Sequence, residues 1–277
     1  MVARCANTAL ISILFGSISD LTGPWHVLMN ESQKTRLDQL LTDKGLAPTR
    51  SRARDLIKRG AVLVGGRVEK RAGVGVAESA DIAVAEAWSG YVSRGALKLA
   101  AALDAFGFDP LGRVALDIGA STGGFTQMLL RRGATRVYAV DVGSGQLHLD
   151  VAGDPRTVNL ERTDARRLDH TLVPEPPGAI TADVSFISLV KALPAALALA
   201  ASGAWLVALV KPQFEVGREG VAKGGIVRSE ALRQAALEAV AEFFRAQAGW
   251  RVEGTLQCPI EGQSGNIEYL LGARYAP

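Results

Sequence analysis

The sequence predicts an α/β protein in which a Rossmann-like sheet domain follows a small basic α+β module. The carboxyl-terminal part alternates short apolar strands with helical segments, and a glycine-rich turn directly follows the first of these strands. Lysine and arginine are concentrated in a short segment ahead of that part. Apolar residues make up 48% and charged residues 21% of the 277 residues, which is typical of globular proteins and excludes a mostly disordered chain.

The length suggests two domains behind an extension. We expect an extension over residues 1–33, the basic module over 34–86 and the sheet domain over 87–277. Residues 5–19 carry no charge and follow Arg4, so they resemble a weak signal peptide. An upstream extension of the reading frame is the alternative that we favour, because a new amphipathic pattern begins near Met29 and no good cleavage site precedes it.

Other compositional signals exclude several protein classes. The two cysteines, Cys5 and Cys258, cannot form a disulfide framework, and with three scattered histidines we expect no metal site. Residues 192–210 are uncharged and long enough to span a membrane, but they contain Pro194 and a Ser-Gly break at 202–203. This stretch therefore predicts a helix, a turn and a buried strand, and we expect no membrane span. We expect a cytoplasmic protein.

The basic module has a charge very different from that of the whole chain. Residues 34–71 contain eleven Lys and Arg against four Asp and Glu, a net charge of +7, whereas the chain carries +3. Leucines predict one short helix ending near Gly45, Thr49 or Ser51 can cap a second that ends at Gly60, and residues 62–68 predict a hairpin. A solvated face would explain one basic helix, but the excess continues through helix, hairpin and turn, which favours nucleic acid. The candidate RNA-binding residues are Arg36, Arg50, Arg52, Arg54, Lys58, Arg59, Arg67 and Lys70.

Three motifs in this module support the interpretation. They are RLD at 36–38, SRARDLI at 51–57 and GAVLVGG at 60–66. With them, residues from 34 to about 85 resemble the S-four-type RNA-binding domain. The resemblance implies binding of structured RNA by shape and phosphate contacts, as suits the deep groove of A-form RNA.

The glycine-rich turn predicts a ligand site in the sheet domain. Residues 113–118 form a predicted buried strand, GASTGG follows at 119–124, and a helix follows at 125–132. Ser121 occupies the place of the second glycine of a dinucleotide fingerprint, and the carboxylate of Asp117 suits a cationic or hydroxyl-rich ligand better than a pyrophosphate. Asp141 ends the next strand, 22 residues after Gly119, where an acid can bind ribose hydroxyls. A tight turn with a capping aspartate in any α/β fold is the alternative.

In combination, the turn and the second acid resemble the S-adenosylmethionine site of the seven-stranded methyltransferases. The resemblance implies that Asp117, just before the turn, belongs to the cofactor-binding residues and that Asp141 binds the ribose. It also implies that Asp164 lies near the adenine. The residues implied to line the methionine part are Gly119, Ser121, Gly123 and Phe125.

Further charged residues border apolar segments of the sheet domain. In an open α/β sheet functional groups gather at the carboxyl ends of strands. The residues expected at such ends are Asp117, Asp141, Asp183 and Lys211. Lys98 lies in a predicted helix ahead of the first strand, and Glu268 lies among apolar residues that predict a strand.

Lys98, Asp183, Lys211 and Glu268 match the Lys-Asp-Lys-Glu tetrad of FtsJ-like ribose 2′-O-methyltransferases. They lie in the motifs SRGALK (93–98), DVSFIS (183–188), VKPQFE (210–215) and SGNIEY (264–269). Together with the basic module, they make residues 34–275 similar to the TlyA family of ribosomal-RNA methyltransferases. The resemblance implies methylation of a cytidine ribose in large-subunit RNA, and in some members also small-subunit RNA. The implied partner is ribosomal RNA or a ribosomal subunit.

Residue chemistry suggests roles for the tetrad. A ribose hydroxyl must lose a proton, and a neutral lysine can accept it if burial and a nearby cation lower its pKa. Lys211 is the candidate base and Lys98 the nearby cation, with Asp183 and Glu268 holding the lysines and the hydroxyl. In the opposite arrangement, both lysines stay charged and pair structurally with the acids. Two other functions stay open: RNA binding without methyl transfer, and a membrane-active haemolysin.

Overall fold

The computed structural model describes residues 34–58, 60–85, 90–222, 224–262 and 265–277. The described chain divides into two compact units, with the division between Ala83 and Val84. The uncharged stretch 5–19 and the predicted RNA-binding residue Arg59 lie outside the described residues.

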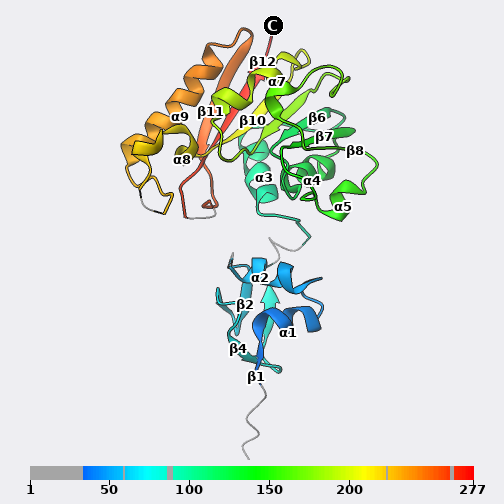
Figure 1. The fold of residues 1–277 in the computed structure, drawn as a ribbon. Coiled ribbons are helices and arrows are strands. Elements are labelled where there is room, and N and C mark those ends of the chain that lie inside the picture. The colour runs from blue at the N-terminus through cyan, green and yellow to red at the C-terminus, as the bar shows by residue number, and fades with distance from the viewer. Residues whose placement is uncertain (1–33, 59, 86–89, 223, 263–264) are drawn as a thin grey trace, which may run out of the picture. The chain divides into compact units, whose positions relative to one another are not determined.

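The first unit is a small α+β module (Figure 1). The predicted helices and hairpin are present, and Thr49 Oγ1 caps the second helix by accepting the backbone N–H of Arg52 at 3.2 Å. The strands β1 and β4 pair antiparallel, and β3, β2 and β5 form a separate sheet. Leu37, Leu41 and Ile57 are fully buried between the helices and the strands. The elements are β1 (Lys34–Arg36), α1 (Leu37–Asp43), α2 (Arg50–Lys58), β2 (Val62–Val64), β3 (Arg67–Val68), β4 (Gly75–Ala77) and β5 (Ile82–Val84).

The second unit contains a seven-stranded sheet in the order β11-β12-β10-β9-β6-β7-β8 (Figure 1). From β10 to β8 all neighbouring strands are parallel, while β12 runs antiparallel to both β10 and β11. The strands are β6 (Val114–Ile118), β7 (Arg136–Asp141), β8 (Thr157–Glu161), β9 (Ala179–Ala182), β10 (Trp205–Val210), β11 (Trp250–Gln257) and β12 (Tyr269–Tyr275). The helices are α3 (Gly95–Phe106), α4 (Gly124–Arg131), α5 (Leu149–Ala152), η2 (Ala165–Arg167), α6 (Leu189–Ala192), α7 (Pro194–Ala198), α8 (Pro212–Glu215), η3 (Arg218–Gly220) and α9 (Glu230–Arg245).

Helices cover both faces of this sheet, so the unit has three layers. In β10, Leu206, Ala208 and Val210 pack into the core beneath α6, α7 and α9, and the alternate residues pack against α3. A strand whose two faces are both buried must be apolar throughout, which explains the uninterrupted apolar run 205–210. The predicted helix, turn and strand over 192–210 are therefore confirmed. Among the described residues, no helix is both long and apolar enough to cross a membrane.

One detail of the sequence prediction is wrong. Glu268 does not lie inside a strand, because β12 begins one residue later, at Tyr269. The register explains the difference, since Tyr269 pairs with Val210, the last residue of β10. Glu268 therefore lies just beyond the paired region, at the edge of the sheet where β10 ends.

Candidate active site

The sheet brings three of the four tetrad residues to one edge. Asp183 follows β9 and Lys211 follows β10, and the carboxyl ends of parallel strands lie at the same edge of a sheet. Glu268 reaches this edge from the opposite direction, because β12 is antiparallel to β10. Lys98 comes from α3, which packs against β10, β11 and β12. The fold therefore brings together Lys98 and Glu268, which are 170 positions apart in the chain.

The tetrad forms two ion pairs of different exposure. Lys98 pairs with Glu268, and the two residues are only 7% and 3% exposed. Lys211 Nζ lies 2.6 Å from Asp183 Oδ1, and these two side chains are partly exposed. Asp183 Oδ1 has no hydrogen-bond partner among the described residues, so its 2.6 Å contact with Lys211 Nζ is an ion pair without hydrogen-bond geometry. Each lysine thus lies beside one acid, a pairing that both arrangements considered for the tetrad contain.

A large cavity opens beside the Lys211–Asp183 pair. It has a volume of about 1290 Å³ and lies over the ends of β6, β7, β9 and β10. The predicted site residues that line it are Gly119, Ser121, Asp141, Asp164 and Asp183. Asp117, Gly123 and Phe125 are buried behind this lining. Four of the seven candidate cofactor residues therefore line this cavity, and the other three lie behind its wall.

Gly119 allows the close approach of two strand ends. Its φ of +80° lies in the left-handed region, and a Cβ added there would lie 2.5 Å from the carbonyl oxygen of Asp183. A backbone oxygen cannot move aside as a flexible side chain can. Only glycine therefore lets the turn after β6 lie directly against the residue that pairs with Lys211.

Asp141 joins two loops at the cavity wall. Its carboxylate accepts the backbone N–H of Ser121 at 2.8 Å and that of Gly143 at 2.7 Å. Glu161, at the end of β8, accepts three backbone N–H groups from residues 145–147 and so holds the next part of the same loop. These hydrogen bonds lower the pKa of Glu161 to about 2, so its carboxylate stays charged at neutral pH.

Asp117 supports the glycine-rich turn from within the core. Its carboxylate accepts hydrogen bonds from the hydroxyls of Thr126 at 2.6 Å and Thr181 at 2.9 Å. Burial raises the pKa of Asp117 to about 6, and the negative charge of Asp183 adds to the rise. Asp117 therefore ties α4 and β9 to β6, close to the charged pair at the edge.

Asp164 is already engaged by its own helical turn. Its side chain caps η2 by accepting the backbone N–H of Arg166 at 3.0 Å, and it also pairs with the Arg166 guanidinium. These contacts lower the pKa of Asp164 to about 2. Both residues line the cavity, so a ligand at this end would meet a carboxylate and a guanidinium together.

Three lining residues escaped the sequence analysis. Phe186 is 92% exposed, has a φ of +66° and lies with its ring centroid 5.3 Å from that of Phe214. Ser185 Oγ accepts a hydrogen bond from Lys211 Nζ at 2.9 Å, and Gln213 Oε1 is buried without a partner among the described residues. The available signal was a serine and a phenylalanine two and three residues after Asp183, which follows β9.

The candidate RNA-binding residues of the first unit occupy different settings. Arg36, Arg50 and Arg54 all contact Asp38, and Arg52 pairs with Asp55 at 3.2 Å. The remaining described candidates, which are all exposed, are Lys58, Arg67 and Lys70.

No cluster of three or more His, Cys, Asp or Glu side chains in the described part of the chain could hold a metal ion.

Comparisons with known proteins agree with both units. The family model of the FtsJ-like methyltransferases matches residues 91–275, and the S4 domain model matches residues 35–82. The 16S/23S rRNA (cytidine-2′-O)-methyltransferase TlyA of Mycobacterium tuberculosis is 44% identical over 88% of this chain and 91% of its own. Hemolysin A of Brachyspira hyodysenteriae is 38% identical over 85% of this chain and 98% of its own.

A solved structure from Streptococcus thermophilus, described as a candidate hemolysin, has 36% identity and a TM-score of 0.67. It covers 88% of this chain, which covers 90% of that chain. Proteins with methyltransferase names and proteins with hemolysin names therefore share one architecture with this chain. The tetrad, the glycine-rich turn and the two matched domains together place the chain in the TlyA family of FtsJ-like methyltransferases with an S4 domain.

Proposed function

We propose that this protein transfers the methyl group of S-adenosylmethionine to the 2′-hydroxyl of a cytidine in ribosomal RNA. The large subunit is the expected source of that RNA, with the small subunit as a further substrate. The observation that carries the proposal is the pairing of Lys211 with Asp183 at the rim of the cavity, beside the Gly119 turn. The names of the relatives from M. tuberculosis and Campylobacter jejuni, both rRNA (cytidine-2′-O)-methyltransferases, support it.

Several features of the cavity support S-adenosylmethionine as its ligand. The Gly119 turn allows a ligand to approach the backbone closely, and the buried Gln213 Oε1 offers an acceptor that a ligand N–H could satisfy. Asp141 would hold the ribose hydroxyls, and Asp164 with Arg166 would lie at the adenine. Asp183 places a negative charge where a positively charged sulfonium is favoured.

When bound, S-adenosylmethionine supplies a methyl group that is already activated by its positive sulfur. The protein must therefore align the ribose oxygen and remove its proton. Lys211 Nζ is the group that would accept this proton, after releasing its own to solvent at the partly exposed rim. Asp183 and Ser185 hold Nζ in place for this role. The ribose oxygen would gain the methyl group as the sulfonium loses it.

Lys98 and Glu268 would have a different role from Lys211. Their pair is almost fully buried, which holds the Glu268 segment against α3 at the end of β10. The positive charge of Lys98 would stabilise the developing alkoxide, while Glu268 would keep that charge in place.

The amino-terminal module would supply most of the RNA affinity. Its net charge of +7 over residues 34–71 suits the phosphate backbone, and the S4 domain match supports RNA as its ligand. The slightly acidic remainder of the chain would contribute the site of reaction.

The decisive experiment measures transfer from methyl-labelled S-adenosylmethionine to each isolated ribosomal subunit, followed by mapping of the modified nucleotide. We expect label on a cytidine 2′-oxygen with the unaltered chain and none with Lys211→Ala. Label on a base atom would contradict the ribose assignment, and full transfer by Lys211→Ala would contradict its role as the base. Binding without any transfer would instead support a protein that only binds RNA.

A further inference from the structure

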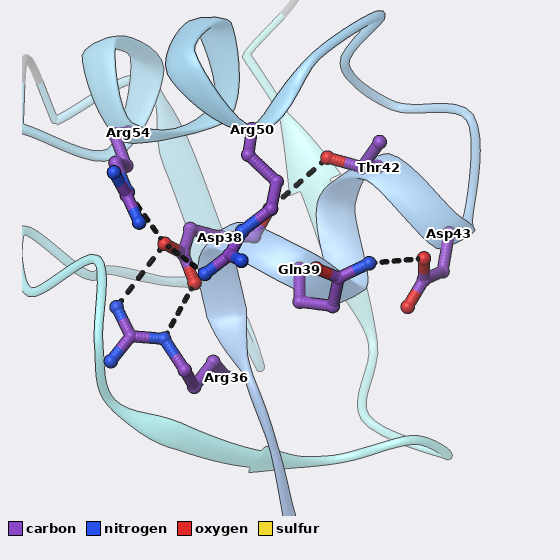
Figure 2. A network of polar contacts seen from close by, with 7 residues as sticks. All are labelled: Arg36, Asp38, Gln39, Thr42, Asp43, Arg50 and Arg54. Atoms are coloured by element: carbon purple, nitrogen blue, oxygen red, sulfur yellow. Dashed lines mark hydrogen bonds and ion pairs between the residues drawn. The ribbon is translucent and has the colours of Figure 1, made fainter.

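Three arginines of the first unit converge on one buried carboxylate (Figure 2). Arg36 donates from Nε to Asp38 Oδ1 at 3.0 Å and from Nη2 to Oδ2 at 3.2 Å. Arg54 Nε donates to Oδ2 at 2.7 Å, and Arg50 Nη2 donates to the same oxygen at 3.3 Å. The arginines come from the end of β1 and from one face of α2, so three guanidiniums are brought together by a single anion.

Burial of the acid contrasts with exposure of the bases. The Asp38 side chain is 0% exposed, whereas those of Arg36, Arg50 and Arg54 are 53%, 44% and 49% exposed. These arginines, and Arg36 above all, hold the pKa of Asp38 well below its usual range, so the acid stays charged. Three positive charges against one leave a net charge of +2 that is open to solvent.

The guanidiniums also keep free donors. Each carries five N–H groups, and the contacts with Asp38 within the described residues use two in Arg36 and one each in Arg50 and Arg54. Guanidinium groups recognise phosphate by paired, charge-assisted hydrogen bonds. An arginine that is already fixed loses less conformational entropy when it binds.

We propose that Asp38 is a positioning residue that holds Arg36, Arg50 and Arg54 as a preformed binding site for a phosphodiester of RNA. The inference rests on the proposed function and deepens it by naming the group that the basic module binds and the residue that orders the site. The acid does not touch the RNA. It offsets the mutual repulsion of three cations and fixes the direction of each fork.

Backbone contacts fix the positions of Asp38 and Arg36 in this site. The backbone N–H of Asp38 donates to the carbonyl of Ala72 at 3.0 Å, which fixes the first turn of α1. A Cβ added at Gly73 would lie 3.0 Å from Nη1 of Arg36, so the guanidinium packs closely against this glycine. The carboxylate also lies in the first turn of a helix, where the helix dipole favours a negative charge.

The variant Asp38→Asn distinguishes a positioning role of Asp38 from a general effect of net charge on RNA affinity. Both Asp38→Asn and the control Asp43→Asn raise the net charge of the module by one, but Asp43 is exposed and accepts a hydrogen bond from Gln39 of the same helix. Simple electrostatics predicts tighter RNA binding by both variants. Positioning predicts that Asp38→Asn binds about tenfold more weakly in spite of its added positive charge, while Asp43→Asn binds at least as tightly as the unaltered chain.

The measurement is equilibrium binding of the full chain to protein-free large-subunit rRNA over a range of salt concentrations. We expect the slope of affinity against salt to fall by about one for Asp38→Asn, as for one lost phosphate contact. Thermal unfolding of each variant reports whether the module stays folded. Affinity of Asp38→Asn equal to or above that of the unaltered chain would overturn the inference.

Arg54→Lys tests the same site if Asp38→Asn does not fold. It keeps the charge but loses the fork that can contact Asp38 and a phosphate together, so we expect several-fold weaker binding. The matched control is Arg71→Lys, whose bidentate pair with Glu69 lies outside the cluster. Equal affinities of Arg54→Lys and the unaltered chain would overturn the inference.

Methyl transfer by the unaltered chain distinguishes the two proposals. If it methylates rRNA while Asp38→Asn and Arg54→Lys bind that RNA normally, the phosphate site is wrong and the proposed function stands. If it binds rRNA in the expected Asp38-dependent way but transfers no methyl group, the proposed function is wrong and the phosphate site stands.

Discussion

Lys98 on α3 and Glu268, one residue before β12, form an ion pair that is almost completely removed from solvent. Burying two charges is costly, and their mutual attraction offsets this cost only while both are present. The pair therefore makes the integrity of the site sensitive to the loss of either partner.

Removal of one partner should destabilise the protein more than removal of both. We expect Lys98→Met to lower the free energy of unfolding by about 3–5 kcal/mol, because it leaves the Glu268 carboxylate buried and unpaired. Adding Glu268→Leu should restore much of this loss without restoring methyl transfer. Urea unfolding and methyl transfer to rRNA measure the two effects.

An exposed pair provides the control for this cycle. Arg132 and Asp104 lie 2.8 Å apart with both side chains largely in solvent, so Arg132→Met should cost less than about 1 kcal/mol. Equal costs for Lys98→Met and Arg132→Met would contradict the assignment of a tightly coupled buried pair.

Gly119→Ala should weaken cofactor binding more than the strain of an alanine in a left-handed backbone conformation would by itself. The new Cβ would lie 2.5 Å from the carbonyl oxygen of Asp183, so the turn and the strand end must separate. We expect S-adenosylmethionine to bind at least tenfold more weakly, which corresponds to about 1.4 kcal/mol of binding free energy. Isothermal titration calorimetry of both proteins measures this affinity.

Gly107→Ala is the matched control for Gly119→Ala. Gly107 also has a left-handed φ, of +62°, but an added Cβ would meet nothing within 4 Å. It should cost about 1 kcal/mol of stability through backbone strain and leave cofactor affinity unchanged. Similar cofactor affinities for both variants would argue against close packing at Gly119 as the basis of the site.

Phe186→Ala should weaken activity on RNA without weakening the fold. A large aromatic ring that is 92% exposed contributes little to the core, yet it lies at the cavity rim in a strained conformation. Rings of this kind stack on nucleic-acid bases for about 1–3 kcal/mol each. We expect a rise in the KM for RNA of about fivefold or more, with the thermal midpoint and cofactor affinity unchanged.

Leu111→Ala is the control for the loss of an exposed apolar side chain, since Leu111 is 69% exposed and is not among the residues that line the cavity. The proposed contact of Phe186 with RNA would be wrong if the two variants had the same KM.

Asp117 should make stability depend on pH. Burial raises its pKa to about 6 from the ordinary 3.8, so the folded protein holds this proton more tightly than the unfolded chain. Its contribution to stability is therefore fully present below about pH 4 and is lost as pH rises through 6. Asp117→Asn removes this titration, so the variant should gain about 3 kcal/mol relative to the unaltered protein between pH 4 and pH 7. Urea unfolding at several pH values measures the difference, and a constant difference would contradict the shifted pKa.

The amino-acid sequence was sufficient to predict two domains, a sheet of parallel strands and the strand ends at which the functional groups gather. These depend on local patterns: a buried strand is apolar, a helix start needs a cap such as Thr49, and functional groups follow strands. The tetrad residues could be listed by resemblance because each belongs to a short motif beside a strand or helix.

The interactions among these groups follow from the fold of the whole chain. Lys98 meets Glu268 because β12 returns antiparallel beside β10, and Lys211 meets Asp183 because β9 and β10 are parallel neighbours. No local motif encodes either pairing of strands. Likewise, Phe125 and Asp117 support the cavity from behind, and three arginines of the basic module share Asp38. Burial and pairing depend on contacts between distant segments, whereas a sequence motif extends over only a few residues.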